Sequence, residues 1–510
     1  MKVLLTAYTA YPRIGGRSTV MNILKQCLEA AGHQVDILAH TPGLQEVYIV
    51  GRQRVQKYPL RKAVEAYLDR TLPFSFPDMT PWMRWRETER YTFEAAIRAM
   101  DLSAYDLIHT HDIMSSLACQ RAIENIPIVA SFHNLKSKEW QVNDQDGCKP
   151  SIETRYVSRE EYFSVSRPAY TLVPCEWLRA SFIELGAEPS RLHVVPYGIL
   201  LQDFQQKAAA ETELIKKSGV PVLLCPARLV PIKGHRYLLR ALERLQREGR
   251  TFVCWIAGNG VLEQELKEEV RRRNLTESVR FLGGRTDLPA VMRLADVVVL
   301  PTLHDTSPLV IMEAQLSGLP VISTDVGGVK DLLLDDPAGM VGPGADAEYL
   351  YRAISQFIAE PEKWSRRAQL FRSRAEERWS DKRLAEETLS WYRTAIESFR
   401  GNPHAQKELK LDEELLRAVF ESGSNPPALT EQGSIDGKVY GGEASVPFTV
   451  HLLDISWVTL QTAKTDAQGH FSFEHVPPGA YAVMGTDGTR WNALHVQVRA
   501  RERSICHLSL

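Results

Sequence analysis

Hydrophobic residues fall along most of the chain in short runs separated by longer amphipathic stretches. The runs are rich in Val, Ile and Leu without polar alternation, which is typical of parallel strands covered on both faces. One series occupies residues 3–7, 35–39, 106–109, 126–132, 170–174 and 192–196, and a second occupies 220–225, 252–257, 279–282, 297–300 and 320–323. Helical patterns lie between them, for example over 18–31, 235–248 and 262–273. Two such series in tandem predict two doubly wound α/β domains.

The pattern changes toward the C-terminus. A polar, alanine-containing stretch at 203–219 indicates the junction between the α/β domains, and an amphipathic helix is expected at 379–398. After Gly433, short strand-like runs with turn sequences between them predict an all-β sandwich. The expected domains are therefore a first Rossmann-like domain (1–205), a second (206–376), a C-terminal helix of the catalytic unit (377–400), a linker with one helical segment (401–432) and a β-sandwich (433–510).

Size and composition limit the class of protein. The 510 residues exceed a single core, which rarely grows beyond about 250–300 residues. No apolar stretch is long enough to span a bilayer, and the first residues are too short a run for a signal peptide, so a cytoplasmic location is expected. The net charge of −2 gives no reason to expect nucleic acid as a partner. The seven cysteines are scattered and never form C-x-x-C, which argues against a zinc site or a disulfide framework.

The most informative chemistry follows the buried run at 297–300. Asp305 lies in the next loop, and a helix is expected to begin near Pro308 and to carry Glu313 about one turn in. Ligands of doubly wound folds bind beyond the carboxyl ends of the strands, and a helix start offers free N–H groups to a diphosphate or to sugar hydroxyls. Glu313 is therefore expected to accept hydrogen bonds from a ribose diol.

Three further strand ends carry related features. Arg228 and Lys233 follow one run, Gly258-Asn259-Gly260 follows another, and Gly283-Gly284-Arg285 follows a third. Arg grips two oxygens at once and Lys adds a point charge, while glycine lets the backbone approach a ligand. Each feature alone is more often a tight turn or a solvated loop. Four of them in consistent order at strand ends predict a nucleotide-diphosphate site.

These residues carry a family resemblance that covers residues 1–395. The chain resembles the family 4 retaining glycosyltransferases of the GT-B fold, whose hallmark is a pair of acids eight positions apart. Asp305 and Glu313 have that spacing, and the sequence from Glu313 to Ile322, followed by Gly327-Gly328, is close to the family pattern. Arg228 and Lys233 match its diphosphate pair, and Gly258-Asn259-Gly260 matches its G-x-G loop.

The resemblance implies a nucleotide-sugar donor bound by the second domain, no cofactor and no metal ion, and transfer with retention of configuration to a glycan, lipid or small-molecule hydroxyl. It implies a catalytic set of Asp305, His111, Arg228 and Lys233. The donor site that it implies consists of Gly15, Gly16, Arg228, Lys233, Gly258, Asn259, Gly283, Arg285, Asp305, Thr306, Ser307, Leu309, Val310 and Glu313.

In the first domain, the resemblance assigns the loop Pro12-Arg13-Ile14-Gly15-Gly16 to the donor phosphates; from the residues alone it is a turn between a strand and a helix. The segment 106–112 matches the D-x-x-H-x-H pattern of the family, which assigns His111 to the neighbourhood of the transferred sugar. The alternative is a histidine satisfied within the core. His133, after another strand, is a weaker candidate of the same kind.

Two departures from the family bear on donor and acceptor preference. The family usually has Glu where this chain has Asp305, so the carboxylate reaches one methylene less far. Its N-G-[VI]-D segment near the hinge appears here as Tyr197-Gly198-Ile199-Leu200.

Two long loops are expected in the first domain. Residues 51–90 mix basic and aromatic side chains, which would suit an anionic membrane, an acidic acceptor or a solvated insertion. Residues 134–166 are expected to shape the acceptor pocket, and Asp144-Gln145-Asp146 within them to be a solvated loop rather than a metal site.

The tail resembles the carboxypeptidase regulatory-like (transthyretin-like) β-sandwich domains in residues 465–471 and 477–481, which implies an interaction or carbohydrate-binding module. Two alternatives to a transferase stay open. One is a non-catalytic nucleotide-sugar or glycan-binding protein, which the Asp305 substitution favours. The other is a sugar-nucleotide epimerase of the same fold, against which the two acids and the Arg228–Lys233 pair argue.

Overall fold

The structure is a computed structural model that describes residues 1–12, 16–143, 152–420, 433–440, 448–453, 459–466, 468–476, 479–486, 491–498 and 503–509. The chain separates into two compact units. One comprises residues 1–139 and 153–419, and the other comprises 140–152 and 420–510. Both α/β domains belong to the first unit.

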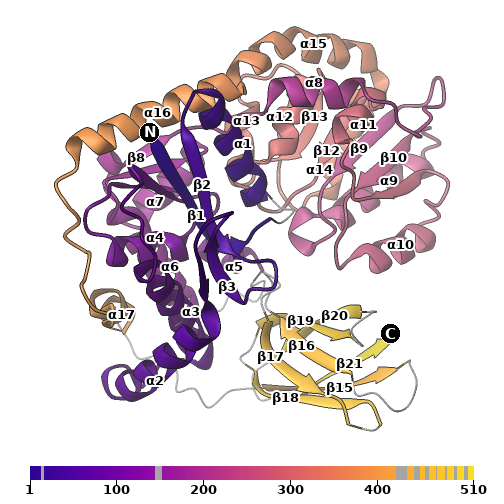
Figure 1. The fold of residues 1–510 in the computed structure, drawn as a ribbon. Coiled ribbons are helices and arrows are strands. Elements are labelled where there is room, and N and C mark those ends of the chain that lie inside the picture. The colour runs from indigo at the N-terminus through magenta and orange to yellow at the C-terminus, as the bar shows by residue number, and fades with distance from the viewer. Residues whose placement is uncertain are drawn as a thin grey trace. The chain divides into compact units, whose positions relative to one another are not determined.

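The first domain is built on an eight-stranded sheet of order β4-β3-β2-β1-β5-β6-β7-β8 (Figure 1). Its strands are β1 (Lys2–Ala10), β2 (Gln34–His40), β3 (Glu46–Ile49), β4 (Arg54–Gln56), β5 (Leu107–Thr110), β6 (Ile128–Ser131), β7 (Tyr170–Val173) and β8 (Leu192–Val194). Neighbours are parallel except at β3, which pairs antiparallel with β2 and β4. Every predicted run of the first series is a strand. The hydrophobic pattern missed β3 and β4 because they are short and lie at the edge.

The helices of this domain are α1 (Gly16–Ala30), α2 (Lys57–Ser75), α3 (Pro81–Arg98), α4 (Ile113–Ala122), α5 (Lys136–Asn143), α6 (Ile152–Ser166) and α7 (Glu176–Glu184), with a 3₁₀ turn at Pro189–Arg191. The prediction of long loops at 51–90 and 134–166 was therefore wrong over most of the described residues. The sequence hid α3 because its buried face carries charged residues, including Arg86, Glu87, Arg90 and Glu94. Their ion pairs let them lie where a hydrophobic pattern expects apolar side chains.

The basic residues predicted to form a surface at 51–90 are largely neutralised. Lys57 and Arg61 both pair with Glu89, and Arg86 pairs with Glu160. Arg52 and Arg54 have acidic partners as well, Asp36 at 3.0 Å and Glu46 at 3.5 Å. This part of the first domain is therefore a folded, charge-balanced pair of helices rather than a free basic surface.

The second domain is built on a six-stranded sheet of order β11-β10-β9-β12-β13-β14 in which all neighbours are parallel. Its strands are β9 (Val222–Pro226), β10 (Val253–Ala257), β11 (Val279–Gly283), β12 (Val297–Leu300), β13 (Val321–Thr324) and β14 (Gly339–Gly342). Its helices are α8 (Leu201–Ala209), α9 (His235–Arg247), α10 (Glu263–Arg272), α11 (Leu288–Leu294), α12 (Leu309–Leu316), α13 (Val329–Leu333), α14 (Ala347–Ala359) and α15 (Pro361–Arg378), with a 3₁₀ turn, η2, at Pro231–Lys233. The predicted runs of the second series are confirmed as strands, and the two sheets confirm the doubly wound α/β class.

After α15, the chain returns to the first domain through α16 (Asp381–Ser398), the orange helix that runs along that domain in Figure 1. Leu384, Leu389 and Tyr392 are buried against α1 and the strands of the first sheet. The amphipathic helix predicted at 379–398 is thus confirmed, and its apolar side faces the first domain.

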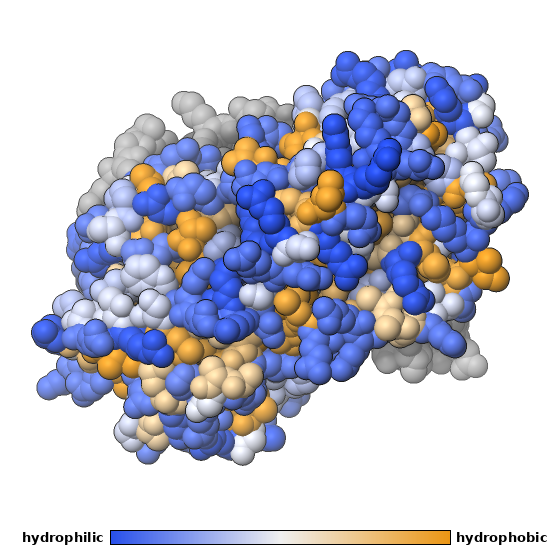
Figure 2. All heavy atoms as spheres, turned by 90° about the horizontal axis from the view of Figure 1, so that it is seen from above, coloured by the Kyte–Doolittle hydropathy of each residue, from blue (hydrophilic) through white to orange (hydrophobic). Residues whose placement is uncertain are grey.

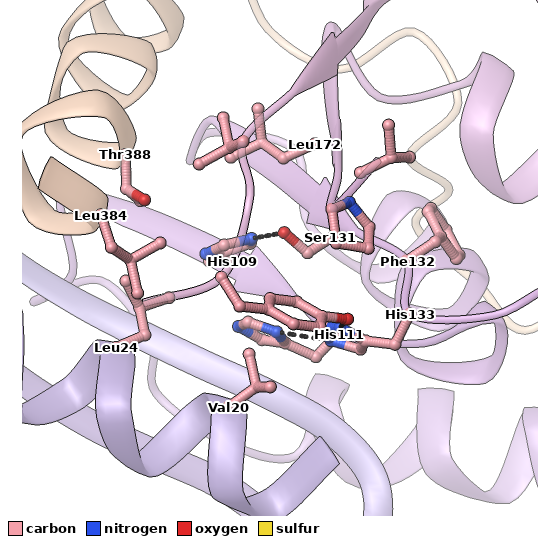
Figure 3. Close-up of a pocket in the computed structure, with 14 residues that line it drawn as sticks. Val20, Leu24, His109, His111, Ser131, Phe132, His133, Leu172, Leu384 and Thr388 are labelled. Atoms are coloured by element: carbon pink, nitrogen blue, oxygen red, sulfur yellow. Dashed lines mark hydrogen bonds between the residues drawn. The ribbon is translucent and has the colours of Figure 1, made fainter. Parts of the chain in front are cut away.

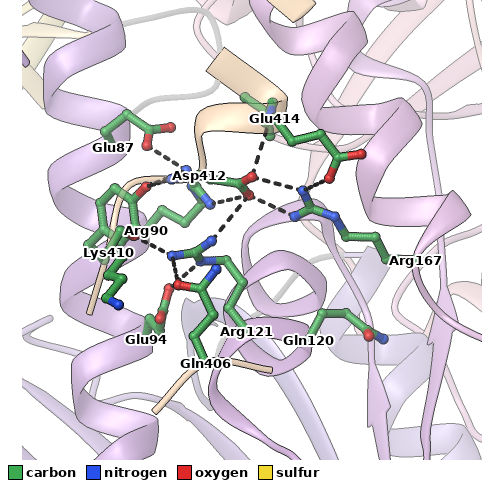
Figure 4. Close-up of polar contacts among 12 residues, drawn as sticks. Glu87, Arg90, Glu94, Gln120, Arg121, Arg167, Gln406, Lys410, Asp412 and Glu414 are labelled. Carbon is green, nitrogen blue, oxygen red and sulfur yellow. Dashed lines mark hydrogen bonds and ion pairs between the residues drawn. The ribbon is translucent and has the colours of Figure 1, made fainter. Parts of the chain in front are cut away.

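Residues 401–419, which lie in the segment that the sequence predicted as a linker with one helix, are instead packed on the first domain (Figure 4). Asp412, just before α17 (Glu413–Phe420), accepts two hydrogen bonds from Arg167 at 2.7 and 2.8 Å. Arg90 and Arg121 also pair with this carboxylate, at 3.3 and 3.7 Å. Burial alone would raise the pKa of Asp412, but its hydrogen bonds to Arg167 and the neighbouring arginine charges outweigh burial and hold the pKa well below its usual range. The apolar residues Leu415, Leu416 and Val419 of α17 are buried as well.

The C-terminal unit contains two small sheets, of order β18-β15-β21 and β17-β16-β19-β20. Its strands are β15 (Gly433–Tyr440), β16 (Thr449–Leu453), β17 (Thr459–Lys464), β18 (His470–Val476), β19 (Gly479–Thr486), β20 (Trp491–Val498) and β21 (Arg503–Ser509). A core that includes Ile435, Val450 and Phe473 lies between them. At the turn predicted before β18, Asp466 accepts hydrogen bonds from the backbone N–H groups of Gln468 and His470. The predicted all-β fold of the tail is confirmed.

The face of the molecule drawn in Figure 2 is mainly polar. Figure 2 shows a largely hydrophilic face on which hydrophobic side chains gather only in small groups. Within the described ranges, each helix is too short or too polar to cross a membrane.

Candidate active site

The loops that follow the strands of the second sheet are joined to one another by backbone hydrogen bonds. The bonds link the ends of β11, β10, β9, β12 and β13 in turn. They run from Gly258 N–H to Gly283 O (2.8 Å), Leu229 N–H to Asn259 O (3.0 Å), Leu303 N–H to Ile232 O (2.7 Å) and Gly328 N–H to Asp305 O (3.0 Å). The four windows singled out in the sequence therefore lie side by side at one edge of the sheet, as the strand-end rule predicts.

Two glycines of these loops are required by the packing of the loops themselves. A Cβ on Gly258 would lie 2.1 Å from the carbonyl oxygen of Ala227, and one on Gly234 would lie 1.9 Å from that of Pro301. Both distances are far shorter than a van der Waals contact. The sequence attributed Gly258 to the close approach of a ligand, whereas the packing of one loop on the next already explains it.

Lys233 and Asp305 form an ion pair across two of these loops. Lys233 ends η2, and Asp305 lies in the loop between β12 and α12. Their side chains are 13% and 18% exposed, so the pair is sheltered but reachable from solvent. The acid predicted to lie near the sugar and the lysine predicted to bind the diphosphate thus neutralise each other in the free protein.

The two arginines predicted for the site differ in their surroundings. Arg285 is engaged by Glu213 and by Asp287, each at 2.5 Å, so its charge is already balanced. Arg228 is exposed, and its guanidinium group has neither an ion pair nor a hydrogen bond with any part of the chain that the structure describes. Arg228 is therefore the cation of these loops whose side chain is open to an anionic ligand, whereas Arg285, like Lys233, has acidic partners in the free protein.

The loop before α12 and the helix itself hold further unpaired polar groups. The hydroxyls of Thr306 and Ser307 are buried without hydrogen-bond partners within the described chain. Leu309 and Val310, in the first turn of α12, are half-buried. Burial raises the pKa of the Glu313 carboxyl to about 7, so this group titrates near neutral pH. Such a carboxyl group can donate a hydrogen bond or accept one, depending on its protonation state.

In the first domain, three histidines surround a small cavity of about 30 Å³ (Figure 3). Nδ1 of His111 lies 3.1 Å from Nε2 of His133, whose Nδ1 lies 2.7 Å from the hydroxyl of Tyr197. His109 lies beside His111, between the hydroxyls of Tyr392 (2.6 Å) and Ser131 (2.7 Å). His133, the weaker sequence candidate, thus contacts His111 directly.

These histidines are neutral near pH 7 because they are buried. Burial lowers the pKa of His109 and of His133 to about 3. For His111, burial together with the neighbouring His109, His133 and Arg17 sets the pKa well below its usual range. The cluster is therefore built for hydrogen bonding rather than for charge.

Sequence reasoning missed two residues beside this cluster. Arg17, in the first turn of α1, pairs at 3.1 Å with Asp112, the residue after His111. Asp112 also caps α4 by accepting a hydrogen bond from the N–H of Ser115 at 2.8 Å. An Asp just before a predicted helix is a recognisable cap, but nothing local in the sequence pairs it with Arg17. Gly16 begins α1, whereas Gly15 lies outside the described residues.

Across the described ranges there is no group of three or more His, Cys, Asp or Glu side chains arranged to hold a metal ion. The Asp144-Gln145-Asp146 segment lies outside the described residues.

Comparison with known proteins gives the family. Residues 14–203 match the family described as Glycosyltransferase Family 4, and residues 206–375 match Glycosyl transferases group 1. The chain is 31% identical to a D-inositol 3-phosphate glycosyltransferase of Saccharomonospora viridis, over 58% of this chain and 72% of that protein.

Solved structures agree in fold. A sucrose-phosphate synthase from Thermosynechococcus elongatus superposes with a TM-score of 0.61 at 19% identity, over 78% of this chain and all of that one (100%). HepE of Anabaena in complex with UDP superposes with a TM-score of 0.53 at 18% identity, over 77% of this chain and 100% of that one. The matched families, the relative and the two Rossmann-like domains agree, and the chain belongs to the group 1 and family 4 glycosyltransferases of the GT-B fold.

Proposed function

We propose that this glycosyltransferase takes its sugar from a nucleotide-diphosphate sugar held at the strand-end loops of the second domain. The observation that carries the proposal is the position of Arg228, Lys233 and Asp305 on neighbouring loops, with Arg228 unpaired in the described chain. UDP in the complex of HepE, which shares the fold, is further support. The acceptor is a hydroxyl group of a glycan, a lipid or a small molecule.

In this proposal, the protein supplies the positive charge that the leaving group needs. As the bond between the sugar and the diphosphate breaks, negative charge grows on the diphosphate, and Arg228 and Lys233 stabilise it. Lys233 exchanges its partner Asp305 for a phosphate oxygen, which frees the Asp305 carboxylate for a sugar hydroxyl or for the positive charge at the anomeric carbon. Glu313 accepts hydrogen bonds from the ribose diol. The acceptor attacks the face from which the diphosphate leaves, so configuration is retained.

The first test removes the two cations. Arg228→Ala and Lys233→Ala are each expected to lower kcat/KM about 10- to 100-fold, because a charge-assisted hydrogen bond contributes roughly 1.5–3 kcal/mol. Rates are measured with a panel of labelled UDP-, GDP- and ADP-sugars. Arg247→Ala is the control, because it removes a charge from the same domain on the exposed part of α9. Wild-type rates in both Arg228→Ala and Lys233→Ala would mean that the donor binds elsewhere.

The same panel tests the chemistry. Activity is expected to survive EDTA, and the anomeric configuration of the product, read by NMR, is expected to match that of the donor. Complete loss with EDTA that manganese or magnesium restores would refute the metal-free proposal. Binding of a nucleotide sugar without any turnover would favour a non-catalytic binding protein.

The proposal includes a location for the protein in the cell. A cytoplasmic location is supported by Cys27, Cys119, Cys175, Cys225 and Cys254, which are free and buried. We do not extend the proposal to an anionic membrane, because acidic partners neutralise most of the basic residues in α2 and α3.

A further inference from the structure

His111 is the end of a continuous chain of hydrogen bonds. The Tyr197 hydroxyl lies 2.7 Å from Nδ1 of His133, and Nε2 of His133 lies 3.1 Å from Nδ1 of His111. The planes of the two imidazole rings are nearly parallel, with an angle of 4° between them. His111 and Tyr197 are buried and His133 is half-buried, and all three side chains line the small cavity.

The direction of the protons along this chain follows from the Tyr197 hydroxyl. Its only hydrogen-bond partner in the described chain is His133. If the Tyr197 hydroxyl accepted a hydrogen bond from His133, its own O–H would have no acceptor among those residues, which is unfavourable for a buried hydroxyl. Tyr197 therefore donates to Nδ1 of His133. The proton of the neutral His133 ring is then on Nε2, and it is donated to Nδ1 of His111.

This order leaves the proton of His111 on Nε2. That nitrogen is buried and has no hydrogen-bond partner within the described ranges. His111 lines the cavity of about 30 Å³ seen in Figure 3, which has room for a water molecule or a single hydroxyl group but not for a sugar ring. A buried N–H without a partner is unfavourable until an oxygen atom reaches it.

The neighbouring His109 provides the contrast. Both of its ring nitrogens are occupied, Nδ1 by Tyr392 and Nε2 by Ser131. Of the two histidines from β5 and the loop after it, only His111 has a nitrogen left for a ligand.

We propose that Tyr197 and His133 are positioning residues that fix the tautomer of His111, so that it offers a neutral Nε2–H donor to an oxygen atom of the sugar substrate. The inference rests on the proposed function, because it takes the ligand beside His111 to be the sugar. The proposal also gives a role to Tyr197, the residue at which this chain departs from the family pattern. Where the family has Asn in its N-G-[VI]-D segment, this chain has the tyrosine that orients His133.

The test compares two tyrosines. Tyr197→Phe removes the hydroxyl on His133, and Tyr392→Phe removes the equivalent hydroxyl on His109, so both variants lose one buried hydrogen bond. The ring nitrogens of ¹⁵N-histidine-labelled enzyme are observed by long-range ¹H–¹⁵N NMR near pH 7, with His111→Asn to assign His111. Steady-state rates use the donor of the panel that the wild-type enzyme turns over fastest.

The wild-type enzyme is expected to show His111 as the Nε2–H tautomer. Tyr197→Phe is expected to populate both tautomers and to lower kcat about tenfold with little change in the KM of the donor, whereas Tyr392→Phe is expected to change neither the tautomer nor kcat by this amount. An Nδ1–H tautomer of His111 in the wild type, or an unchanged tautomer in Tyr197→Phe, would overturn the inference. An equal loss of kcat in both variants would overturn it too, because packing alone would then explain the loss.

Failure of the proposed function would be recognised separately. Wild-type enzyme that is inactive with every donor of the panel would refute that function. The tautomers are measured on the free enzyme, so they would still decide whether Tyr197 and His133 orient His111.

Discussion

Two clusters of buried polar side chains lie in the first domain, and they are built in opposite ways. Around Asp412, three arginines meet carboxylates, and each guanidinium has an acidic partner (Figure 4). Around His111, the groups are neutral, and one buried nitrogen is left without a partner in the described chain (Figure 3). The ionic cluster holds a distant segment in place, whereas the histidine cluster keeps one donor free. The charges around Asp412 are paired and serve stability, although Nε of Arg90 and Nε of Arg167 also lack a partner in the described chain. In the proposal made above, the free Nε2–H of His111 is stability given up for a ligand.

The largest effect on the ionic cluster is expected from deletion of the segment that contains Asp412. A chain that ends after residue 400 loses Asp412 and the buried face of α17, and it leaves three buried arginines without this carboxylate. It is expected to be insoluble or to melt far below the wild type. A chain that ends after residue 420 keeps these contacts and is expected to melt near the wild-type temperature. Equal melting temperatures of the two truncated chains would show that the segment is only a linker.

A single substitution isolates the charge itself. Asp412→Ala is expected to lower the free energy of unfolding by about 3–5 kcal/mol, because it leaves buried arginine charges uncompensated. Glu414→Ala is the matched control, since Glu414 also contacts Arg167, at 3.1 Å, but its side chain is 64% exposed. Its loss is expected to matter by less than about 1 kcal/mol. Urea unfolding measures both, and similar values for the two variants would contradict the ionic role of Asp412.

The histidine cluster is expected to respond in the opposite way. His111→Asn removes the Nε2 donor and is expected to lower turnover by about 10²-fold, the usual effect of losing one oriented donor. Its free energy of unfolding is expected to fall by only about 1 kcal/mol, for the lost hydrogen bond to His133. Rates and urea unfolding are measured on the same preparation. A large loss of stability with unchanged turnover of the folded enzyme would place His111 with the structural residues.

The pH dependence of stability also separates the two clusters. His133 has a pKa lowered by burial to about 3, while the unfolded chain takes up a proton near 6.5. The unfolded state therefore binds more protons below pH 6.5, and the stability of the fold falls as the pH drops toward 3, by up to about 1.4 kcal/mol per pH unit for each such histidine. His133→Gln is expected to lose less stability than the wild type between pH 6.5 and 4.

Asp412 is charged and ion-paired in the folded protein, whereas His133 is neutral. The contribution of Asp412 to stability is also lost as the pH falls, but at lower pH than that of His133. Its lowered pKa gives stability that is fully present above the unfolded value near 3.9 and is lost only as the pH falls below it. Asp412→Ala is thus expected to parallel the wild type from pH 6.5 to about 4. Unfolding curves collected from pH 7 to pH 3.5 would contradict the assignment if the two variants diverged from the wild type over the same range.

The sequence by itself determined the framework of the two α/β domains and the place of the candidate donor site. Parallel strands covered on both faces leave unbroken apolar runs, so strands such as β9 and β12 were predicted from their residues alone. Because such strands end at one edge of the sheet, the loops with Arg228, Lys233 and Asp305 were predicted to lie together, as they do. The start of α12 after Pro308 was also predicted from the local sequence.

Only the tertiary structure decided which polar groups pair with which. Asp412 and Arg90 are separated by 322 positions in the chain, and Tyr197 and His133 by 64. Neither separation leaves a periodic signal, because hydrogen bonds and ion pairs between elements depend on how helices and strands pack, not on local spacing. For the same reason, the charged, buried face of α3 was hidden in the sequence. The Lys233–Asp305 ion pair was also found only in the tertiary structure, because it joins two loops that were each predicted separately and that lie together at the edge of one sheet.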